Sequence, residues 1–470
     1  MTVLWTTDEL VAATGGRLDG EITRPIGGVS IDSRSIAAGD IFVAIAGENR
    51  DGHAFAAAAL KNGAALAIVS RPDPEMRDSG ALLVVDEPLA ALRRLAAAAR
   101  ARSAARIVGI TGSVGKTSSK EALRLALAPS GPTHASASSY NNHWGVPLSL
   151  SRLPRDAAYA VFEIGMSQAG EITPLTRLVR PHVAIVTTIA PSHLGHFPSL
   201  AEIADAKAEI FAGVEPGGAA VINRDSEFFD RLATAARQSG IARIVGFGEH
   251  ESAEVRLSKV ALHETCSCVT ADILGETVSY RLGAPGRHLA LNSLAVLAAA
   301  QLAGGDLARA AMALSHLEPQ KGRGVRFRLD APDGAITVID ESYNANPASV
   351  RAALALLGQA SPGRGGRRIA VLGDMLELGD EGPRLHAELA AAVDESGTNI
   401  VYACGAGMAH LWEALPATRR GAYAETSQDL EEAVLRDVRG GDVVMVKGSL
   451  GSRMMPLVDA IKARYPERAA

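Results

Sequence analysis

A glycine-rich turn between an apolar run and a predicted helix is the segment with the clearest chemistry. Residues 107–120 read IVGITGSVGKTSSK. Glycines let backbone N–H groups approach a polyphosphate closely, the lysine adds positive charge, and the hydroxyl after it suits the accompanying Mg²⁺. The segment therefore predicts a loop that binds nucleotide phosphates, made of Gly112, Ser113, Val114, Gly115, Lys116, Thr117 and Ser118.

The glycine spacing of this loop differs from the common P-loop. That pattern separates its two glycines by four residues, which would require a glycine where Ile110 stands, and here Gly109 lies one residue earlier. This different glycine spacing reduces the number of nucleotide-binding families to which the chain can belong. A plain glycine-rich turn with a solvated lysine is the alternative, but strand, glycines, Lys-Thr and helix all occur in order.

Two further candidates follow runs that we predict to be buried strands. Glu163 closes AYAVFEIG, and His193 follows VAIVTTIA. Because parallel strands end at one edge of a sheet, both should lie beside the phosphate loop, and Glu163 is the natural Mg²⁺ partner of Thr117. From the residues alone, His193 is either a ligand or a structural histidine. Lys207, in the next predicted helix, is consistent with a surface lysine.

Polar side chains gather in three other segments, each with turn formation or capping as the alternative explanation. SYNNHWGVP combines amides with an imidazole, and GRHLALNS places a histidine and an asparagine on one helix face. VIDESYNANP, after KGRG, offers an acid for ribose hydroxyls, a flat ring and amides, as a nucleotide contact near a domain junction requires. The candidates are Asn141, Asn142, His143, His288, Asn292, Arg323, Asp340, Tyr343, Asn344 and Asn346.

Three segments with different patterns of predicted strands and helices must position these residues. Residues 28–85 predict a small α/β domain. The next segment alternates buried-strand runs with helices, which predicts a mainly parallel sheet covered on both faces, with antiparallel strands appended at 254–282. The last segment predicts a second doubly wound, Rossmann-like domain. We therefore expect an α/β protein whose three domains span 1–84, 85–321 and 322–470.

Composition argues against several function classes. The 470 residues are 47% hydrophobic and 4% aromatic, with a net charge of -5, so stacking platforms and basic grooves for nucleic acid are scarce. There is no basic leader and no apolar run of about 18 residues. Cys266, Cys268 and Cys404 fit neither a disulfide framework nor a zinc site. We expect a cytoplasmic monomer that neither binds nucleic acid nor inserts into membranes.

In their order, these motifs resemble the Mur ligase family, the ATP-dependent amide ligases that build the peptide stem of bacterial cell-wall precursors. The offset phosphate loop is followed by FEIGMSQAGEI, TTIAPSHLGHF, DAKAEIF, NSLAVLAA and ESYNANPASVRAAL. The resemblance covers nearly the whole chain. Within the family, YNNHWGVPLSL, LGDMLELG and VKGSLGSRMM are most similar to the member that adds D-alanyl-D-alanine to UDP-N-acetylmuramoyl-tripeptide. The D-N-P-R segment of the diaminopimelate-adding ligase does not occur.

The resemblance implies a role for each candidate. Lys116, Glu163, His193 and Lys207 would be catalytic, and Thr117, Glu163, His193 and Lys207 would serve Mg²⁺. Lys207 would be carbamylated to N6-carboxylysine, since a carbamate attracts a hard cation that an ammonium repels. Asn292, Arg323, Asp340, Tyr343 and Asn344 would bind ATP with the loop, whereas His143 keeps an open role. The implied substrate contacts are Asp32, Ser33, Arg34, Asp51, His53, Asn141, Asn142, Ser167, His288, Asn346, Lys447 and Ser449.

The implied reaction transfers the γ-phosphoryl group of ATP to the terminal carboxylate of the UDP-tripeptide. The amine of D-alanyl-D-alanine then attacks the acyl phosphate, and contacts from three domains imply closure of the C-terminal domain. Three alternatives stay open: a diaminopimelate- or lysine-adding ligase, a folylpolyglutamate-type ligase, and a nucleotide switch or mechanical ATPase. The folylpolyglutamate type lacks a domain before the loop, and a switch does not need the constellation of His193, Lys207 and Asn292.

Overall fold

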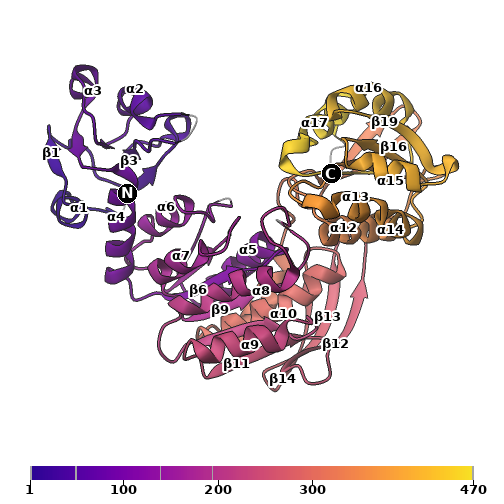
Figure 1. The fold of residues 1–470 in the computed structure, drawn as a ribbon, viewed down its shortest axis with the longest axis horizontal. Coiled ribbons are helices and arrows are strands. Elements are labelled where there is room, and N and C mark those ends of the chain that lie inside the picture. The colour runs from indigo at the N-terminus through magenta and orange to yellow at the C-terminus, as the bar shows by residue number, and fades with distance from the viewer. Residues whose placement is uncertain (1–2, 48–49, 138, 193, 468–470) are drawn as a thin grey trace.

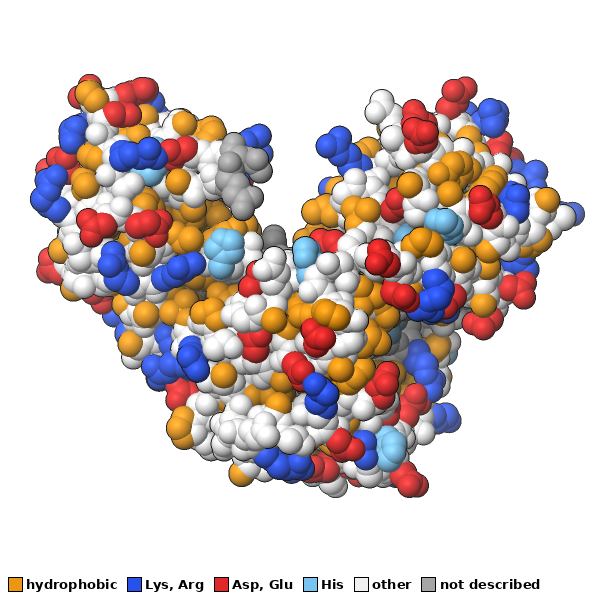
Figure 2. Space-filling model, viewed as in Figure 1, with side chains coloured by type: hydrophobic (Ala, Val, Ile, Leu, Met, Phe, Trp, Pro, Cys, Tyr) orange, Lys and Arg blue, Asp and Glu red, His pale blue; other side chains and the backbone are white. Residues whose placement is uncertain are grey.

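Three α/β domains, each built around its own sheet, make up the protein. The computed structural model describes residues 3–47, 50–137, 139–192 and 194–467, and the strands of these ranges form three separate sheets. The central domain lies at the base of the view, with the N-terminal and C-terminal domains on either side (Figure 1). Figure 2 shows an open hollow between the two outer lobes. The fold class expected from the sequence is confirmed.

The N-terminal sheet has the order β1-β5-β4-β3-β2, in which only β1 runs antiparallel to its neighbour. The apolar runs of its middle strands are buried throughout, as expected for strands covered on both faces. The strands are β1 Arg17–Asp19, β2 Gly28–Ser30, β3 Asp40–Val43, β4 Leu66–Val69 and β5 Leu82–Val84, and the helices are α1 Thr7–Thr14, α2 Ala56–Lys61, α3 Pro74–Ser79 and α4 Pro88–Arg102.

The central sheet has the order β14-β13-β12-β11-β10-β9-β6-β8-β7. Strands β7 to β12 are parallel, and β13 and β14 continue the sheet as antiparallel strands, as the sequence predicted. The strands are β6 Arg106–Thr111, β7 Thr133–Ala135, β8 Tyr159–Glu163, β9 Val183–Val186, β10 Ala219–Asn223, β11 Arg243–Gly248, β12 Val255–Leu262, β13 Ser267–Ile273 and β14 Glu276–Leu282.

Helices cover both faces of this sheet because side chains alternate along each strand. On β6, Val108 and Ile110 pack on one face with α5, α10 and α11, whereas Ile107 packs on the other with α7, α8 and α9. The helices are α5 Lys116–Leu127, α6 Gly145–Ser151, α7 Ile172–Val179, α8 Leu200–Ala208, α9 Phe229–Gln238, α10 Arg287–Leu302 and α11 Leu307–Ala313. None of the helices in the described ranges combines the length and apolarity needed to cross a membrane.

The C-terminal sheet has the order β15-β16-β20-β17-β18-β19 and is parallel apart from β15. Helices α12 to α15 pack on one face, and α16 and α17 on the other. The strands are β15 Val325–Ala331, β16 Gly334–Glu341, β17 Arg368–Gly373, β18 Ile400–Cys404, β19 Arg420–Ala424 and β20 Val443–Lys447, and the helices are α12 Pro347–Gln359, α13 Gly382–Ala387, α14 Leu389–Glu395, α15 Met408–Ala414, α16 Ser427–Asp437 and α17 Met455–Arg464.

The N-terminal and central domains share a packed interface. Leu148 of α6 is buried in the N-terminal core beside α4. The indole Nε1 of Trp5 donates to the carbonyl of Ser151 at 3.0 Å, and Nε of Arg152 donates to the carbonyl of Val29 at 2.5 Å. Because apolar burial and buried hydrogen bonds act together here, these two domains hold a defined relative position.

The C-terminal domain meets the central domain through a smaller loop contact. The N–H of Gly195, after β9, donates to the carbonyl of Glu377 at 3.0 Å. Leu194 packs against the apolar core of the C-terminal domain. Both residues of the central domain belong to the segment between β9 and α8, so this segment carries the contact.

A histidine at the start of β9 gives the fold a predicted pH response. Nδ1 of His182 accepts from the N–H of Ile107 at 3.0 Å. Burial, followed by the charges of Arg106 and Arg100, lowers the pKa of His182 to about 4. The unfolded chain has a histidine pKa of about 6.5 and so binds the proton first as the pH falls. Stability that is complete above the unfolded pKa is therefore lost as the pH falls towards 4.

We expect His182→Asn to weaken this response, because asparagine keeps an acceptor near Nδ1 but does not titrate. The melting temperature of the variant should fall less between pH 7 and pH 5 than that of the parent protein. Thermal unfolding at a series of pH values measures the difference. Equal slopes would mean that His182 does not carry the effect.

Candidate active site

The phosphate loop connects β6 to α5 and needs its glycines for two reasons. Gly112 and Gly115 have φ values of 144° and 87°, which side chains rarely adopt. A Cβ at Gly112 would also clash with Oγ1 of Thr187, and one at Gly115 would clash with Nδ2 of Asn292. The close approach brings Asn292 of α10 to the loop, as the sequence-based hypothesis for a nucleotide contact requires.

Two residues that follow β9, Thr187 and Thr188, fix the conformation of the loop. The N–H of Ser113 donates to the carbonyl of Thr188 at 2.7 Å, and Oγ1 of Thr187 donates to the carbonyl of Val114 at 2.6 Å. Nζ of Lys116 folds back over the loop and donates to the carbonyl of Gly112 at 2.7 Å. Burial lowers the pKa of Lys116, although the charge of Glu163 opposes this shift. The lysine therefore lies over the cradle before any phosphate arrives.

Oxygen ligands for a hard cation meet beside the loop. Oγ1 of Thr117 donates to Oε2 of Glu163 at 2.9 Å, and Nδ2 of Asn141 donates to Oε1 at 2.7 Å. Thr117 is 3% exposed and Glu163 is 1% exposed. Carboxylate and hydroxyl oxygens are ligands that Mg²⁺ prefers, so this pair fits the predicted metal role. Asn141 orients the carboxylate, and Oγ of Ser139 lies 3.3 Å from Oγ1 of Thr117.

Lys207 is buried near the end of α8, so it is not a surface lysine. Its side chain is 1% exposed, and we find no hydrogen bond or ion pair from it to the described residues. Burial, followed by the charge of Lys116, lowers the pKa of Lys207 well below its usual value. A buried cation beside another cation is unfavourable, which favours the neutral amine. His193, the other predicted metal ligand of this region, lies outside the described residues.

The linker into the C-terminal domain is organised around Asp340. This side chain is 1% exposed, and its oxygens accept from the N–H of Gly322 and from both the N–H and the hydroxyl of Ser342. The guanidinium of Arg323 lies 4.2 Å from the ring centre of Tyr343. The fold thus brings Asp340, Arg323 and Tyr343 together at the start of the C-terminal domain, as the hypothesis of a shared nucleotide contact requires.

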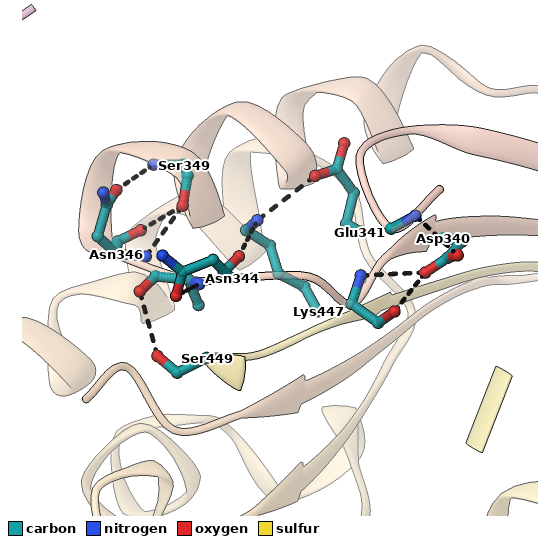
Figure 3. Close-up of polar contacts among 10 residues, drawn as sticks. Asp340, Glu341, Asn344, Asn346, Ser349, Lys447 and Ser449 are labelled. Carbon is teal, nitrogen blue, oxygen red and sulfur yellow. Dashed lines mark hydrogen bonds and ion pairs between the residues drawn. The ribbon is translucent and has the colours of Figure 1, made fainter. Parts of the chain in front are cut away.

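Figure 3 shows how Lys447 at the end of β20 secures the loop that follows β16. Its Nζ donates to the carbonyl of Asn344 at 2.9 Å and lies 3.4 Å from Oε2 of Glu341. Burial lowers the pKa of Lys447, and the charge of Glu341 opposes this shift. Oγ of Ser449 donates to the carbonyl of Ala345 at 3.2 Å. Both predicted substrate contacts are therefore tied to loop backbone.

Two asparagines of the same loop differ in their local roles. Oδ1 of Asn346 accepts from the N–H of Ser349 at 2.9 Å and caps α12 (Figure 3). The side chain of Asn344 is exposed and accepts from the N–H of Ala345 at 2.9 Å. The capping alternative therefore accounts for Asn346, whereas the exposed amide of Asn344 remains accessible to a ligand.

His288 lies at the start of α10, and a charge on the C-terminal domain affects its pKa. Burial, followed by the charge of Lys447, lowers the pKa of His288 to about 4. The imidazole is therefore neutral at physiological pH. A residue of the central domain and one of the C-terminal domain, both predicted to meet substrate, thus lie close enough to interact electrostatically.

Polar groups also gather at the carboxyl edge of the N-terminal sheet. Nδ1–H of His53 donates to Oδ1 of Asp51 at 2.7 Å, because Nε2 already accepts from the N–H of Ser70 at 3.0 Å. The guanidinium and N–H of Arg34 hold the pKa of Asp32 at about 2. These residues follow β2, β3 and β4, with Ser33 in the same turn as Asp32. Ligands of parallel sheets bind at such an edge.

Three of the remaining candidates lie on loops of the central domain. Oδ1 of Asn142 accepts from the N–H of Gly145, the first residue of α6, at 2.9 Å. Ser167 is exposed, and its N–H donates to Oε2 of Glu171 at 2.7 Å. His143 is exposed as well. The turn explanation accounts for the side chain of Asn142, and the other two remain accessible to a substrate.

Sequence reasoning missed three contacts of this site. Thr187 holds the phosphate loop, Ser139 contacts Thr117, and Glu341 pairs with Lys447. Thr187 and Glu341 stand at the ends of buried strands, so the rule that predicted Glu163 could also have found them. Ser139 lies in a loop whose contacts depend on tertiary packing, and no sequence pattern marks it.

Comparisons with known proteins agree along the chain. Residues 25–100 match the Mur ligase family catalytic domain, 110–300 the Mur ligase middle domain, and 325–450 the Mur ligase glutamate ligase domain. The UDP-N-acetylmuramoyl-tripeptide--D-alanyl-D-alanine ligase of Rickettsia prowazekii is 31% identical, covering 97% of this chain and 99% of the relative. The ligase of the same name from Escherichia coli is 34% identical, covering 85% and 86%.

Solved structures give the same result for the fold. A crystal structure of MurF from Acinetobacter baumannii superposes with a TM-score of 0.84 at 30% identity, covering 98% of this chain and 99% of that one. MurF ligase of Thermotoga maritima in complex with ADP has a TM-score of 0.75 at 24% identity, covering 93% and 97%, and supports the fold alone. All three domains therefore have counterparts in these enzymes.

Proposed function

The chain belongs to the Mur ligase family, and on this premise we propose that it joins D-alanyl-D-alanine to UDP-N-acetylmuramoyl-tripeptide at the expense of ATP. The products are UDP-N-acetylmuramoyl-pentapeptide, ADP and phosphate, for peptidoglycan synthesis. The observation that carries the proposal is the phosphate loop with the Thr117–Glu163 pair beside it, in a chain whose relatives of this activity match it from end to end.

Activation of a carboxylate is the first chemical need, because a carboxylate is a poor electrophile. Backbone N–H groups from Gly112 to Lys116 hold the phosphates, and Lys116 exchanges the carbonyl of Gly112 for the transferring phosphoryl group. The bond between the β-γ bridging oxygen and the γ-phosphorus breaks, and a bond from the tripeptide carboxylate to that phosphorus forms. The dipeptide amine then attacks the acyl carbon, loses a proton and releases phosphate. Positioning and electrostatics supply the catalysis.

Thr117 and Glu163 fit a magnesium ion, since both offer buried oxygens beside the phosphate loop. When bound, Mg²⁺ neutralises phosphate charge during phosphoryl transfer. Asn141 keeps the carboxylate of Glu163 oriented. His193, which the family resemblance makes a ligand, completes this part of the proposal and lies outside the described residues.

The environment of Lys207 supports the proposed carbamylation. The lowered pKa of Lys207 leaves a neutral amine, whose nitrogen forms a bond to the carbon of CO₂ and releases a proton to solvent. The resulting N6-carboxylysine carries negative charge next to Lys116, which removes the repulsion between two cations. Its oxygens suit a second Mg²⁺.

The three domains divide the substrates among them, with proposed limits at 1–84, 85–321 and 322–470. Asp32, Asp51 and His53 bind the nucleotide-sugar end, and Lys447 and Ser449 meet the dipeptide. Arg323 and Asp340 contact ATP as the C-terminal domain closes across the open hollow of Figure 2. We place this monomeric enzyme in the cytoplasm, where ATP and small-molecule substrates are present.

Release of ADP tests the proposal directly. With ATP, Mg²⁺, UDP-tripeptide and D-alanyl-D-alanine together, we expect ADP to form. We expect almost no ADP when either the UDP-tripeptide or D-alanyl-D-alanine is left out. Running diaminopimelate and lysine tripeptides in parallel identifies the third stem residue. Hydrolysis of ATP that is indifferent to both peptide substrates would instead indicate a nucleotide switch or mechanical ATPase.

A further inference from the structure

Two exposed leucines lie together at the carboxyl edge of the C-terminal sheet. Leu376 follows β17 and is 45% exposed, whereas Leu450 follows β20 and is 65% exposed. A Cβ added to Gly451, the residue after Leu450, would lie 2.7 Å from Cδ1 of Leu376, so the two loops touch. Large apolar side chains are seldom left in water without a reason when they cluster. We call Leu376 and Leu450 the leucine pair.

The backbone beneath the leucine pair is fixed. The N–H of Leu376 donates to Oγ of Ser449 at 2.9 Å, and the N–H of Ser449 donates to the carbonyl of Asp374 at 3.0 Å. Met375 and Leu378 are both buried in the C-terminal core, and Glu377 between Leu376 and Leu378 adopts a left-handed φ of 64°. The outward position of Leu376 is therefore imposed by a well-packed turn rather than by a loose loop.

The turn that carries Leu376 also reaches the central domain. The carbonyl of Glu377, the next residue, accepts from the N–H of Gly195 at 3.0 Å. Gly195 follows β9, which ends at the same sheet edge as the phosphate loop. In the same segment after β9, the N–H of Ala190 donates to Oγ of Ser113 in the phosphate loop at 3.1 Å. The leucine pair thus stands on the C-terminal domain beside its contact with a segment that also touches the phosphate loop.

A cationic residue stands on the same turn as Leu450, since the N–H of Arg453 donates to the carbonyl of Leu450 at 3.2 Å. Arg453, three residues after Leu450, is exposed, and its guanidinium forms no ion pair with any residue that the structure describes. The incoming dipeptide has two methyl side chains and a carboxylate that the reaction does not consume. An apolar pair followed by a cation matches both features.

We propose that the leucine pair contacts the methyl side chains of the incoming dipeptide and so makes the ligase prefer D-alanyl-D-alanine to glycyl-glycine. Arg453 binds the carboxylate of the dipeptide. The inference rests on the proposed function, because it assigns specificity within that reaction.

Substitution of each leucine tests the assignment. For Leu376→Ala and Leu450→Ala we expect the KM for D-alanyl-D-alanine to rise about tenfold, because losing contact with a methyl group costs about that factor in discrimination. The KM for ATP, the KM for UDP-tripeptide and kcat should stay unchanged. The ratio of kcat/KM for D-alanyl-D-alanine to that for glycyl-glycine should fall by the same factor. Leu450→Met, which keeps a large apolar side chain, should retain most of the parent selectivity ratio.

A matched control is Met312→Ala, since Met312 is an apolar side chain on α11 that is 66% exposed. This variant should keep the parent ratio, and melting temperatures should confirm that all variants fold. An unchanged ratio in both leucine variants would overturn the inference, as would a higher KM for ATP at unchanged dipeptide selectivity, which would mean that the leucines serve domain closure. If the parent protein itself shows no dipeptide-dependent ADP release, the proposed function fails instead.

Discussion

Replacement of Lys116 by alanine is expected to lower the kcat of ligation about 100- to 1000-fold, because one preorganised charge on the transferring phosphoryl group is lost. Its Nζ lies over the phosphate loop, and among the residues that the structure describes it hydrogen-bonds only to the carbonyl of Gly112. The fold should therefore survive the change. Coupled measurement of ADP release with both peptide substrates gives the rate.

The matched control for this prediction is Lys259→Ala, which removes an exposed lysine of β12 in the same domain. This variant should ligate at the parent rate, and both variants should keep the parent circular dichroism spectrum. Near-normal turnover of Lys116→Ala would remove Lys116 from the mechanism.

Lys207→Ala is expected to lower kcat about a hundredfold or more, because the anion proposed next to Lys116 and the phosphates is lost. Short carboxylic acids, which fit the space vacated by the carbamylated side chain, should restore part of the activity. The same acids should not rescue Lys116→Ala. Full activity of Lys207→Ala without any added acid would contradict the metal-site assignment.

A second readout of Lys207 does not depend on activity. When the parent protein is equilibrated with ¹³C-labelled bicarbonate, its ¹³C NMR spectrum should show a carbamate signal that the spectrum of Lys207→Ala lacks. The pKa of Lys207 is lowered, which increases the fraction of free amine that can take up CO₂, and the signal should weaken as acid protonates the amine. Identical spectra from both proteins would place the modification elsewhere or exclude it.

The sequence predicted the architecture well, because strand and helix periodicities differ and each apolar run is long enough for its periodicity to be recognised. It also predicted that Glu163 would lie beside Thr117, since the ends of parallel strands share one edge. The burial of Lys207 could not be predicted in this way. A lysine within an acid-containing helix has the same local pattern on a surface and in a core, and only tertiary packing distinguishes the two.

The local roles of side chains in the C-terminal loops could not be predicted from the sequence either. The motif containing Asn344 and Asn346 presents two similar amides, but one stays exposed and the other caps α12. The contact between Gly115 and Asn292 joins a loop to a helix far along the chain, so no spacing rule reports it. The family resemblance supplied ligand roles for Asn292, Asn344 and Asn346 as expectations but no contacts between residues, whereas residue types alone left turn formation as an equal alternative.

The packed interface between the N-terminal and central domains has a consequence for substrate length. Trp5 and Ser151, with Arg152 and Val29, hold the sheet edge that we propose binds the nucleotide-sugar at a set separation from the phosphate loop. A substrate anchored at one end presents only one position along its peptide to the other. If the substrates bind as proposed, this fixed separation makes the number of stem residues already added decide whether the terminal carboxylate reaches the phosphate.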